Sequence, residues 1–179
     1  MSQIFNIFPT TIYVGEVENH NEYKTEFLRL YEKFDYEENE ISSTVSEGQV
    51  HPLIHLEPSM DAMFREIIRH IKVYVLDVLK FKDMFNYSIT KTWISRTRCK
   101  DQIQWHIHSC SHVSFVYYLN IPPYSHTTKF LNRDNVNSLF LGANNYNSID
   151  SQNMMKEYNS QNAETFFIHP KEGYVSLFP

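Results

Sequence analysis

The sequence predicts a mainly β fold with flanking helices, in which short antiparallel strands form a sandwich or a barrel. Apolar residues first recur at helical spacing, and from Tyr87 onward the period changes to the two-residue alternation of strands. Seven or so short β-prone segments follow. Aromatic residues make up 15% of the chain and glycine occurs only four times, which favours β structure with polar connections over glycine-rich turns.

A length of 179 residues suits one domain with a real core, so we expect a single domain over residues 1–179. Residues 1–86 would supply an N-terminal strand and two packing helices. Residues 87–179 would form the β core, which includes the alternating segment "YSITKTWISRTR" and the later runs "VSFVYYLNI", "TTKFLN", "TFFIH" and "GYVSLF". Trp93 and Trp105 are expected to anchor this core.

Residues 11–17 alternate and read as the first strand, and Asn21 is a candidate N-cap for the helix after it. The acidic, polar residues 35–49 read as a loop. A second helix begins near Ser59, directly after Pro58. Its apolar stripe predicts core packing and consists of Met60, Met63, Phe64, Ile67, Ile71, Tyr74, Val75 and Val78.

Charge and cysteine content exclude several classes of protein. The net charge of −5 gives no basic surface for a nucleic-acid backbone. Cys99 and Cys110 make neither a disulfide framework nor a zinc signature, as expected for reduced thiols. The N-terminus lacks a signal peptide's basic leader, and no apolar run reaches the length of a membrane span. We therefore expect a cytoplasmic protein with neither membrane nor nucleic acid as partner.

The stretch "WHIHSCSH" places His106 and His108 two residues apart at the end of a predicted strand. Side chains at this spacing leave the same face of a strand, with Cα atoms about 6.6–7 Å apart. Two imidazoles can then share one metal ion at bond lengths of about 2.0–2.1 Å. The spacing alone also fits surface histidines, and His112 can be read as a neighbouring polar group.

Several motifs stand in an order that spans nearly the whole chain: "FPTTIY", "TKTWIS", "HIHSCSHVSFVYYL", "TKFLNRD" and "HPKEGYVSLFP". This order resembles a family of 2-oxoglutarate/Fe(II)-dependent oxygenases common in bacteriophages and marine bacteria. The sequence departs from the family's pattern at three positions. Ser109 replaces a proline, Cys110 replaces a usual asparagine, and Phe115 stands where the family tends to have glycine.

The resemblance implies a double-stranded β-helix, a cupin-like jelly-roll barrel, that binds Fe(II) and takes 2-oxoglutarate as co-substrate. The expected activity is that of a dioxygenase that hydroxylates a small-molecule or protein substrate whose identity the sequence does not give. Two histidines and one carboxylate usually hold the metal in a facial triad. The family's usual His-x-Asp appears here as His106-x-His108. Either His108 takes the carboxylate's place or it is not a ligand, and Asp101 is an alternative carboxylate.

We expect Tyr117 and Lys129 to contact 2-oxoglutarate, with Arg96 and Arg98 as further cations near the proposed mouth. No other catalytic residue can be assigned. Relatives continue past the "LFP" segment with a distal histidine and an arginine, whereas this sequence stops at Pro179. We interpret the barrel as lacking its last strand, either because the recorded sequence is incomplete or because the distal ligand has been lost.

Two alternatives follow. The first reads the chain as a non-catalytic cupin-like barrel, a virion or assembly protein of a phage, located in the virion or the host cytoplasm. Its partners would be further copies of itself or other virion proteins. A zinc or manganese cupin with other chemistry would instead need a third ligand from His112, His126 or His169.

Overall fold

A computed structural model of the chain describes residues 2–4, 6, 9–32, 37–38, 43–45, 53–97, 103, 105–122, 128–132 and 156–179. The chain divides into two compact units. One unit comprises residues 1–10 and 121–171, and the other comprises residues 11–120 and 172–179. The second unit contains both helices and the histidine pair. The single domain over residues 1–179 therefore stays a prediction.

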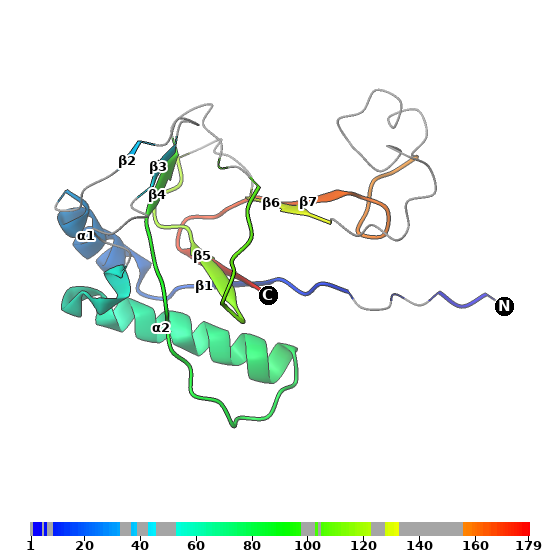
Figure 1. Cartoon of the computed structure of the whole chain (residues 1–179), viewed down its shortest axis with the longest axis horizontal. Coiled ribbons are helices and arrows are strands. Elements are labelled where there is room, and N and C mark those ends of the chain that lie inside the picture. Colours follow the sequence, from blue (N-terminus) through cyan, green and yellow to red (C-terminus); the bar gives the residue numbers. More distant parts are fainter. Residues whose placement is uncertain are drawn as a thin grey trace. The chain divides into compact units, whose positions relative to one another are not determined.

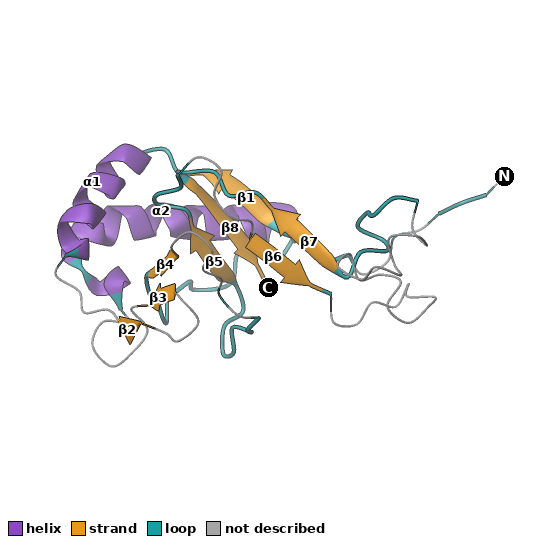
Figure 2. Cartoon of the chain, turned by 90° about the horizontal axis from the view of Figure 1, so that it is seen from above, coloured by secondary structure: helices purple, strands orange, loops and turns teal. Residues whose placement is uncertain are grey.

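The main sheet of the second unit has three antiparallel strands in the order β1-β8-β5. Its central strand is β8 (Tyr174–Phe178), which lies between β1 (Tyr13–Glu16) and β5 (Ser114–Tyr117), as Figure 2 shows. The sheet therefore joins segments from opposite ends of the sequence. All three strands lie within segments predicted from alternation, although each strand is shorter than its segment.

One face of this sheet packs against the helices α1 (His20–Tyr31) and α2 (Asp61–Lys72), and α2 runs alongside the sheet in Figures 1 and 2. Val175 and Leu177 of β8 point to this face and are 0% exposed. The short helices η1 (Ile54–Leu56) and η2 (Pro58–Met60) lead into α2. The core also contains Val17, Phe27, Leu30, Ile54, Met60, Met63, Phe64, Ile67, Ile71 and Tyr74.

The second helix confirms the predicted apolar stripe over most of its length. Every member from Met60 to Tyr74 is buried, whereas Val78 is 42% exposed. After Lys72 the helix continues as the π-helical segment η3 (Val73–Val78), in which the amide of Leu79 bonds the carbonyl of Tyr74. This wider turn rotates the last residues off the core face. The first helix begins at His20 with Asn19 as its N-cap, two residues before the predicted cap.

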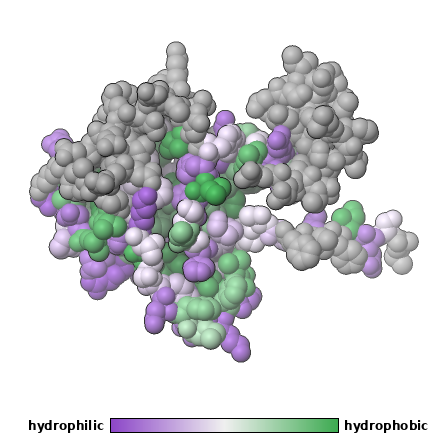
Figure 3. All heavy atoms as spheres, in the orientation of Figure 1, coloured by the Kyte–Doolittle hydropathy of each residue, from purple (hydrophilic) through white to green (hydrophobic). Residues whose placement is uncertain are grey.

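Large apolar side chains are exposed after the π-helical segment, and Figure 3 shows apolar atoms gathered over this end of the helix. Phe81 and Phe85 contact each other in a T-shaped arrangement with ring centroids 6.4 Å apart. The exposed residues are Val78, at the end of the π-helical segment, and Leu79, Phe81, Met84 and Phe85 after it.

A second small sheet corrects the prediction of a loop over residues 35–49. The antiparallel strands β2 (Glu37–Glu38), β3 (Ser43–Val45) and β4 (Ser95–Thr97) lie in sequence order. Ser43 pairs with Thr97 and Val45 with Ser95. The acidic segment forms strands because β4 supplies a pairing partner from far along the chain. Residues 87–94, predicted as part of a longer strand, lie outside any strand.

In the other unit, β6 (Thr128–Leu131) and β7 (Thr165–Ile168) form an antiparallel pair with Thr128 opposite Ile168. The amide of Asn132 extends this pairing by donating to the carbonyl of Glu164. The described elements are thus small antiparallel sheets with two helices, and the jelly-roll barrel stays a prediction. Across the residues described, no helix combines the length and apolarity needed to cross a membrane.

Candidate functional site

Although residues 105–108 lie outside any strand, contrary to the strand predicted there, the side chains of His106 and His108 meet. Their Nε2 atoms lie 3.1 Å apart and their ring centroids 5.0 Å apart. Two nitrogen ligands about 2.0–2.1 Å from one metal, at tetrahedral or octahedral angles, are themselves about 2.8–3.4 Å apart. The observed separation falls within that range. The separation suits two nitrogen ligands of one metal ion, and it equally suits a hydrogen bond between the two rings.

Two aromatic residues from distant parts of the sequence hold the ring of His108. Trp93 stacks on it with a centroid distance of 5.3 Å and an interplanar angle of 27°. Phe178, at the end of β8, meets the ring edge-on at 5.8 Å. His108 is half-buried against this apolar wall, whereas His106 is exposed. The pair thus has aromatic side chains against His108 on one side, and His106 is open to solvent on the other.

The turn that follows the pair is closed by side-chain hydroxyls. Ser111 Oγ donates to the carbonyl of His108 at 3.2 Å and lies 3.2 Å from Ser114 Oγ at the start of β5. Cys110, within the turn, has a φ of 66° and is exposed. This left-handed conformation suits asparagine better than cysteine.

The register of β5 against β8 shows that Tyr117 and Tyr118 lie on opposite faces of the sheet. Ser114 pairs with Phe178, and Tyr117 pairs with Val175, three residues earlier on β8. Because faces alternate along a strand, Tyr117 shares the helix-covered face of Val175, and Phe178 points to the other face. The structure therefore does not bring Tyr117 to the side of the sheet on which Phe178 contacts His108. Its contact with 2-oxoglutarate stays a prediction.

Tyr117 instead belongs to a polar cluster under the first helix. Its hydroxyl lies 2.6 Å from Nδ1 of His20, and Nε2 of His20 lies 3.3 Å from Glu172. Lys24 bonds the same carboxylate oxygen at 2.7 Å and Asn120 Oδ1 at 2.9 Å. Burial, and secondarily the nearby carboxylate of Glu66, raise the pKa of Tyr117, so its hydroxyl remains a proton donor.

Buried hydroxyls that sequence reasoning did not select lie on the face of Phe178. Ser114 and Ser176 are 5% and 0% exposed, and Ser176 Oγ donates to the hydroxyl of Tyr118 at 3.4 Å. Alternation from Ser114 places Tyr118 on this face too. The alternation of Tyr117 and Tyr118 was visible in the sequence, but it could not tell which of them the helices cover.

The remaining predicted residues are dispersed. Lys129 lies on β6 in the other unit, where its Nζ stands 5.8 Å from the ring centre of Phe167. His169 belongs to that unit too, and His112 is exposed in the unit of the histidine pair. The prediction that Trp105 anchors the core is wrong, because Trp105 is 56% exposed. Arg98, Asp101 and His126 lie outside the described residues, as does the side chain of Arg96.

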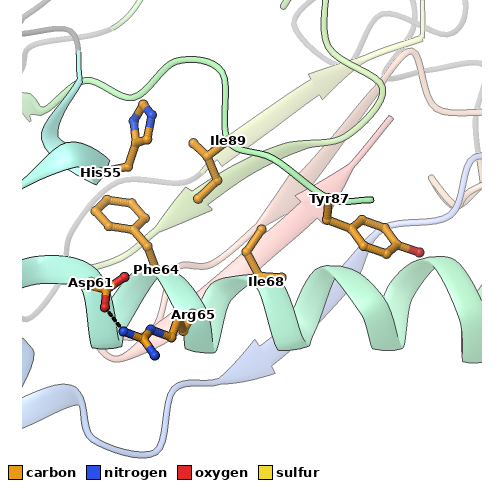
Figure 4. A pocket seen from close by; sticks show the side chains of 7 residues that line it. All are labelled: His55, Asp61, Phe64, Arg65, Ile68, Tyr87 and Ile89. Carbon is orange, nitrogen blue, oxygen red and sulfur yellow. Dashed lines mark hydrogen bonds and ion pairs between the residues drawn. The ribbon is translucent and has the colours of Figure 1, made fainter. Parts of the chain in front are cut away.

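A separate pocket of about 250 Å³ opens against α2 (Figure 4). Apolar side chains form its floor and the Asp61–Arg65 ion pair lies at its edge. Nδ1 of His55 is 3.0 Å from Thr92 Oγ1, and burial lowers the pKa of His55. The lining residues are His55, Asp61, Phe64, Arg65, Ile68, Tyr87 and Ile89, none of which was predicted as a site residue.

Among the residues that the structure describes, no three metal-ligating side chains come together. That His106 and His108 bind a metal therefore stays a prediction. The imidazoles of the pair, their aromatic backing and their open side match the donor set and access that a non-haem iron site needs. The residues present fit such a group as part of its ligand set.

Comparison with known proteins agrees with this chemistry. Residues 91–179 match the model of the family described as "Putative 2OG-Fe(II) oxygenase". This segment contains the histidine pair, Trp93 and Phe178. Through residues 91–179 the chain belongs to this family of 2-oxoglutarate/Fe(II) oxygenases, which confirms the family that the order of motifs predicted. No curated protein matches the chain.

Proposed function

We propose that the protein is a non-haem Fe(II) enzyme that uses 2-oxoglutarate and O₂ to hydroxylate a substrate. The observation that carries the proposal is the 3.1 Å approach of the two Nε2 atoms within the matched segment. In this proposal His106 and His108 are two of the metal's ligands. The bound metal would supply the centre at which oxidative decarboxylation of 2-oxoglutarate is coupled to hydroxylation.

In this proposal, residues of the chain have separate roles in orienting a ligand and in giving access to the metal. Trp93 and Phe178 restrict rotation of the His108 ring, so that its Nε2 keeps facing His106. The exposed side of His106 gives the co-substrate and the substrate access. Both imidazoles must be neutral to act as ligands, so metal affinity should fall as the pH is lowered.

Anaerobic titration of the full-length protein with Fe(II) and 2-oxoglutarate tests the proposal. We expect one iron per chain and a visible metal-to-ligand charge-transfer band that requires both additions. His106→Ala and His108→Ala should abolish the band, whereas His112→Ala, which changes an exposed histidine of the same segment, should retain it. Absence of iron binding by the wild type would reject the proposal and favour the non-catalytic barrel. Equal loss in His112→Ala would reject the assigned ligands.

A further inference from the structure

We propose that Ser111 and Ser114 are positioning residues that hold His108 in its ligand geometry through a chain of hydroxyl groups. This inference rests on the proposed role of His108 as a metal ligand. It adds a function for Ser111, in the turn after the histidine pair, and for Ser114, the first residue of β5. Neither serine would contact the metal, and both would act through the backbone of His108.

The direction of the hydrogen bonds follows from counting protons. The hydroxyl of Ser111 has one proton, which it donates to the carbonyl of His108. In the 3.2 Å contact between the two serines, Ser114 must therefore be the donor and Ser111 the acceptor. A hydroxyl that accepts one hydrogen bond donates a stronger one, so the two bonds reinforce each other. The chain runs from Ser114 Oγ through Ser111 Oγ to His108 O.

The sheet anchors this chain of hydroxyl groups at the Ser114–Phe178 pair, which also contacts the imidazole ring of His108. Ser114 is the partner of Phe178 in the pairing of β5 with β8, and Phe178 contacts the ring of His108. One cross-strand pair thus holds His108 at two points, its backbone through Ser114 and its ring through Phe178. Fixing both points sets the direction of the Cα–Cβ bond and the tilt of the ring together.

The segment that carries the histidine pair is not part of a strand ladder. Residues 105–108 lie outside any strand, and Cys110 adopts a left-handed conformation that is unfavourable for a side chain with a Cβ. Ser114 is 5% exposed, and a buried hydroxyl is costly unless it is hydrogen-bonded. Groups that orient metal ligands typically change metal affinity about 10- to 100-fold when removed.

A purely structural role for the serines is the competing explanation. In that case loss of either hydroxyl would lower stability without changing the metal's environment. Binding of Co(II), whose visible absorption reports the number and geometry of its ligands, separates the two explanations. The unfolding midpoint of the metal-free protein provides the stability readout.

The experiment compares full-length wild type with Ser111→Ala, Ser114→Ala and the double variant. We expect each single variant to bind Co(II) about tenfold more weakly with an altered visible spectrum. The double variant should bind no more weakly than the weaker single variant, because the two hydroxyls act in series. Ser111→Thr keeps the hydroxyl and should restore affinity. Ser109→Ala, at an exposed position of the same turn, is the matched control and should leave affinity and spectrum unchanged.

Three results would overturn the inference: unchanged Co(II) affinity and spectrum in both single variants, additive losses in the double variant, or an equal loss in Ser109→Ala. Failure of the proposed function looks different. In that case the wild type itself would not bind Co(II), or binding would survive His106→Ala and His108→Ala.

Discussion

The hydroxyl of Tyr117 lies 2.6 Å from Nδ1 of His20, which joins β5 to α1 by a side-chain hydrogen bond. Because a carboxylate only accepts, the arrangement that satisfies all three groups has Nε2–H of His20 donating to Glu172 and the tyrosine donating to Nδ1. The bond connects the helix-covered face of the sheet to α1.

Replacing Tyr117 with phenylalanine should therefore lower stability and leave metal binding unchanged. The half-buried His20 loses its donor, which should cost about 1–3 kcal/mol of the free energy of unfolding. Chemical denaturation measures the loss, and Fe(II) titration should give the wild-type affinity. If Tyr117→Phe instead weakens 2-oxoglutarate binding at unchanged stability, Tyr117 contacts the co-substrate as the sequence predicted.

His70 should make the protein less stable at mildly acidic pH. Burial lowers the pKa of His70 from its ordinary value of 6.5, and its Nδ1 lies 2.8 Å from the hydroxyl of Tyr13. Below about pH 6.5 the unfolded chain takes up the proton first, so the free energy of unfolding falls as the pH drops toward the folded-state pKa. The full contribution is present above pH 6.5.

His70→Gln removes this titration and keeps an acceptor for Tyr13. Urea denaturation between pH 5 and pH 8 should show a shallower acid slope for His70→Gln than for wild type. His112→Gln, which changes an exposed histidine, serves as the control. Parallel slopes for wild type and His70→Gln would show that His70 does not contribute.

Cys110→Asn should stabilise the protein. The φ of 66° at Cys110 is tolerated better by asparagine, so we expect a gain of about 0.5–1 kcal/mol in the free energy of unfolding. Cys110→Ala keeps the unfavourable Cβ without asparagine's compensation and should not produce the gain. Thermal and chemical denaturation of the three proteins under reducing conditions provide the comparison. Equal stability of Cys110→Asn and Cys110→Ala would contradict the explanation.

Gly173 should resist substitution for two separable reasons. Its φ is 80°, and a Cβ added there would lie 3.0 Å from Cγ of His20. Gly173→Ala should therefore cost about 1–3 kcal/mol. In the His20→Ala background the contacts with Cγ and Cδ2 are gone and only the Cβ of residue 20 remains, 3.3 Å away, so the cost of Gly173→Ala should be smaller there. A cost that is the same in both backgrounds would assign the whole effect to the backbone.

The sequence predicted the helices better than the strands because a helix satisfies its hydrogen bonds locally. The apolar stripe from Met60 to Tyr74 was sufficient to place α2, and it failed only at Val78, where π-helical bonding changes the period. A strand also needs a partner. Ser43 in β3 pairs with Thr97 in β4, but nothing in either sequence segment identifies the other as its partner. The sequence therefore predicts a loop where β3 lies.

In the candidate site, too, the sequence predicted local features and missed contacts between distant segments. The spacing of His106 and His108 predicted two imidazoles side by side on a strand; the rings do meet, but residues 105–108 lie outside any strand. The packing of Trp93 and Phe178 on His108 could not be read from any local pattern, because it depends on how distant segments meet. Trp105 was predicted in the core because of its size and aromatic character, but no local pattern shows which side of the segment faces solvent.

The central position of β8 has a consequence for the order in which the protein folds during synthesis. Strands β1 and β5 pair only with β8 in their sheet, although both are made long before residues 174–178 leave the ribosome. Until then the apolar faces of α1 and α2 lack Val175 and Leu177, and the ring of His108 lacks Phe178. Closing such a long loop is a slow step. Until synthesis has passed β8, the nascent chain should therefore lack the packed core of this unit, and His108 should lack part of its aromatic support.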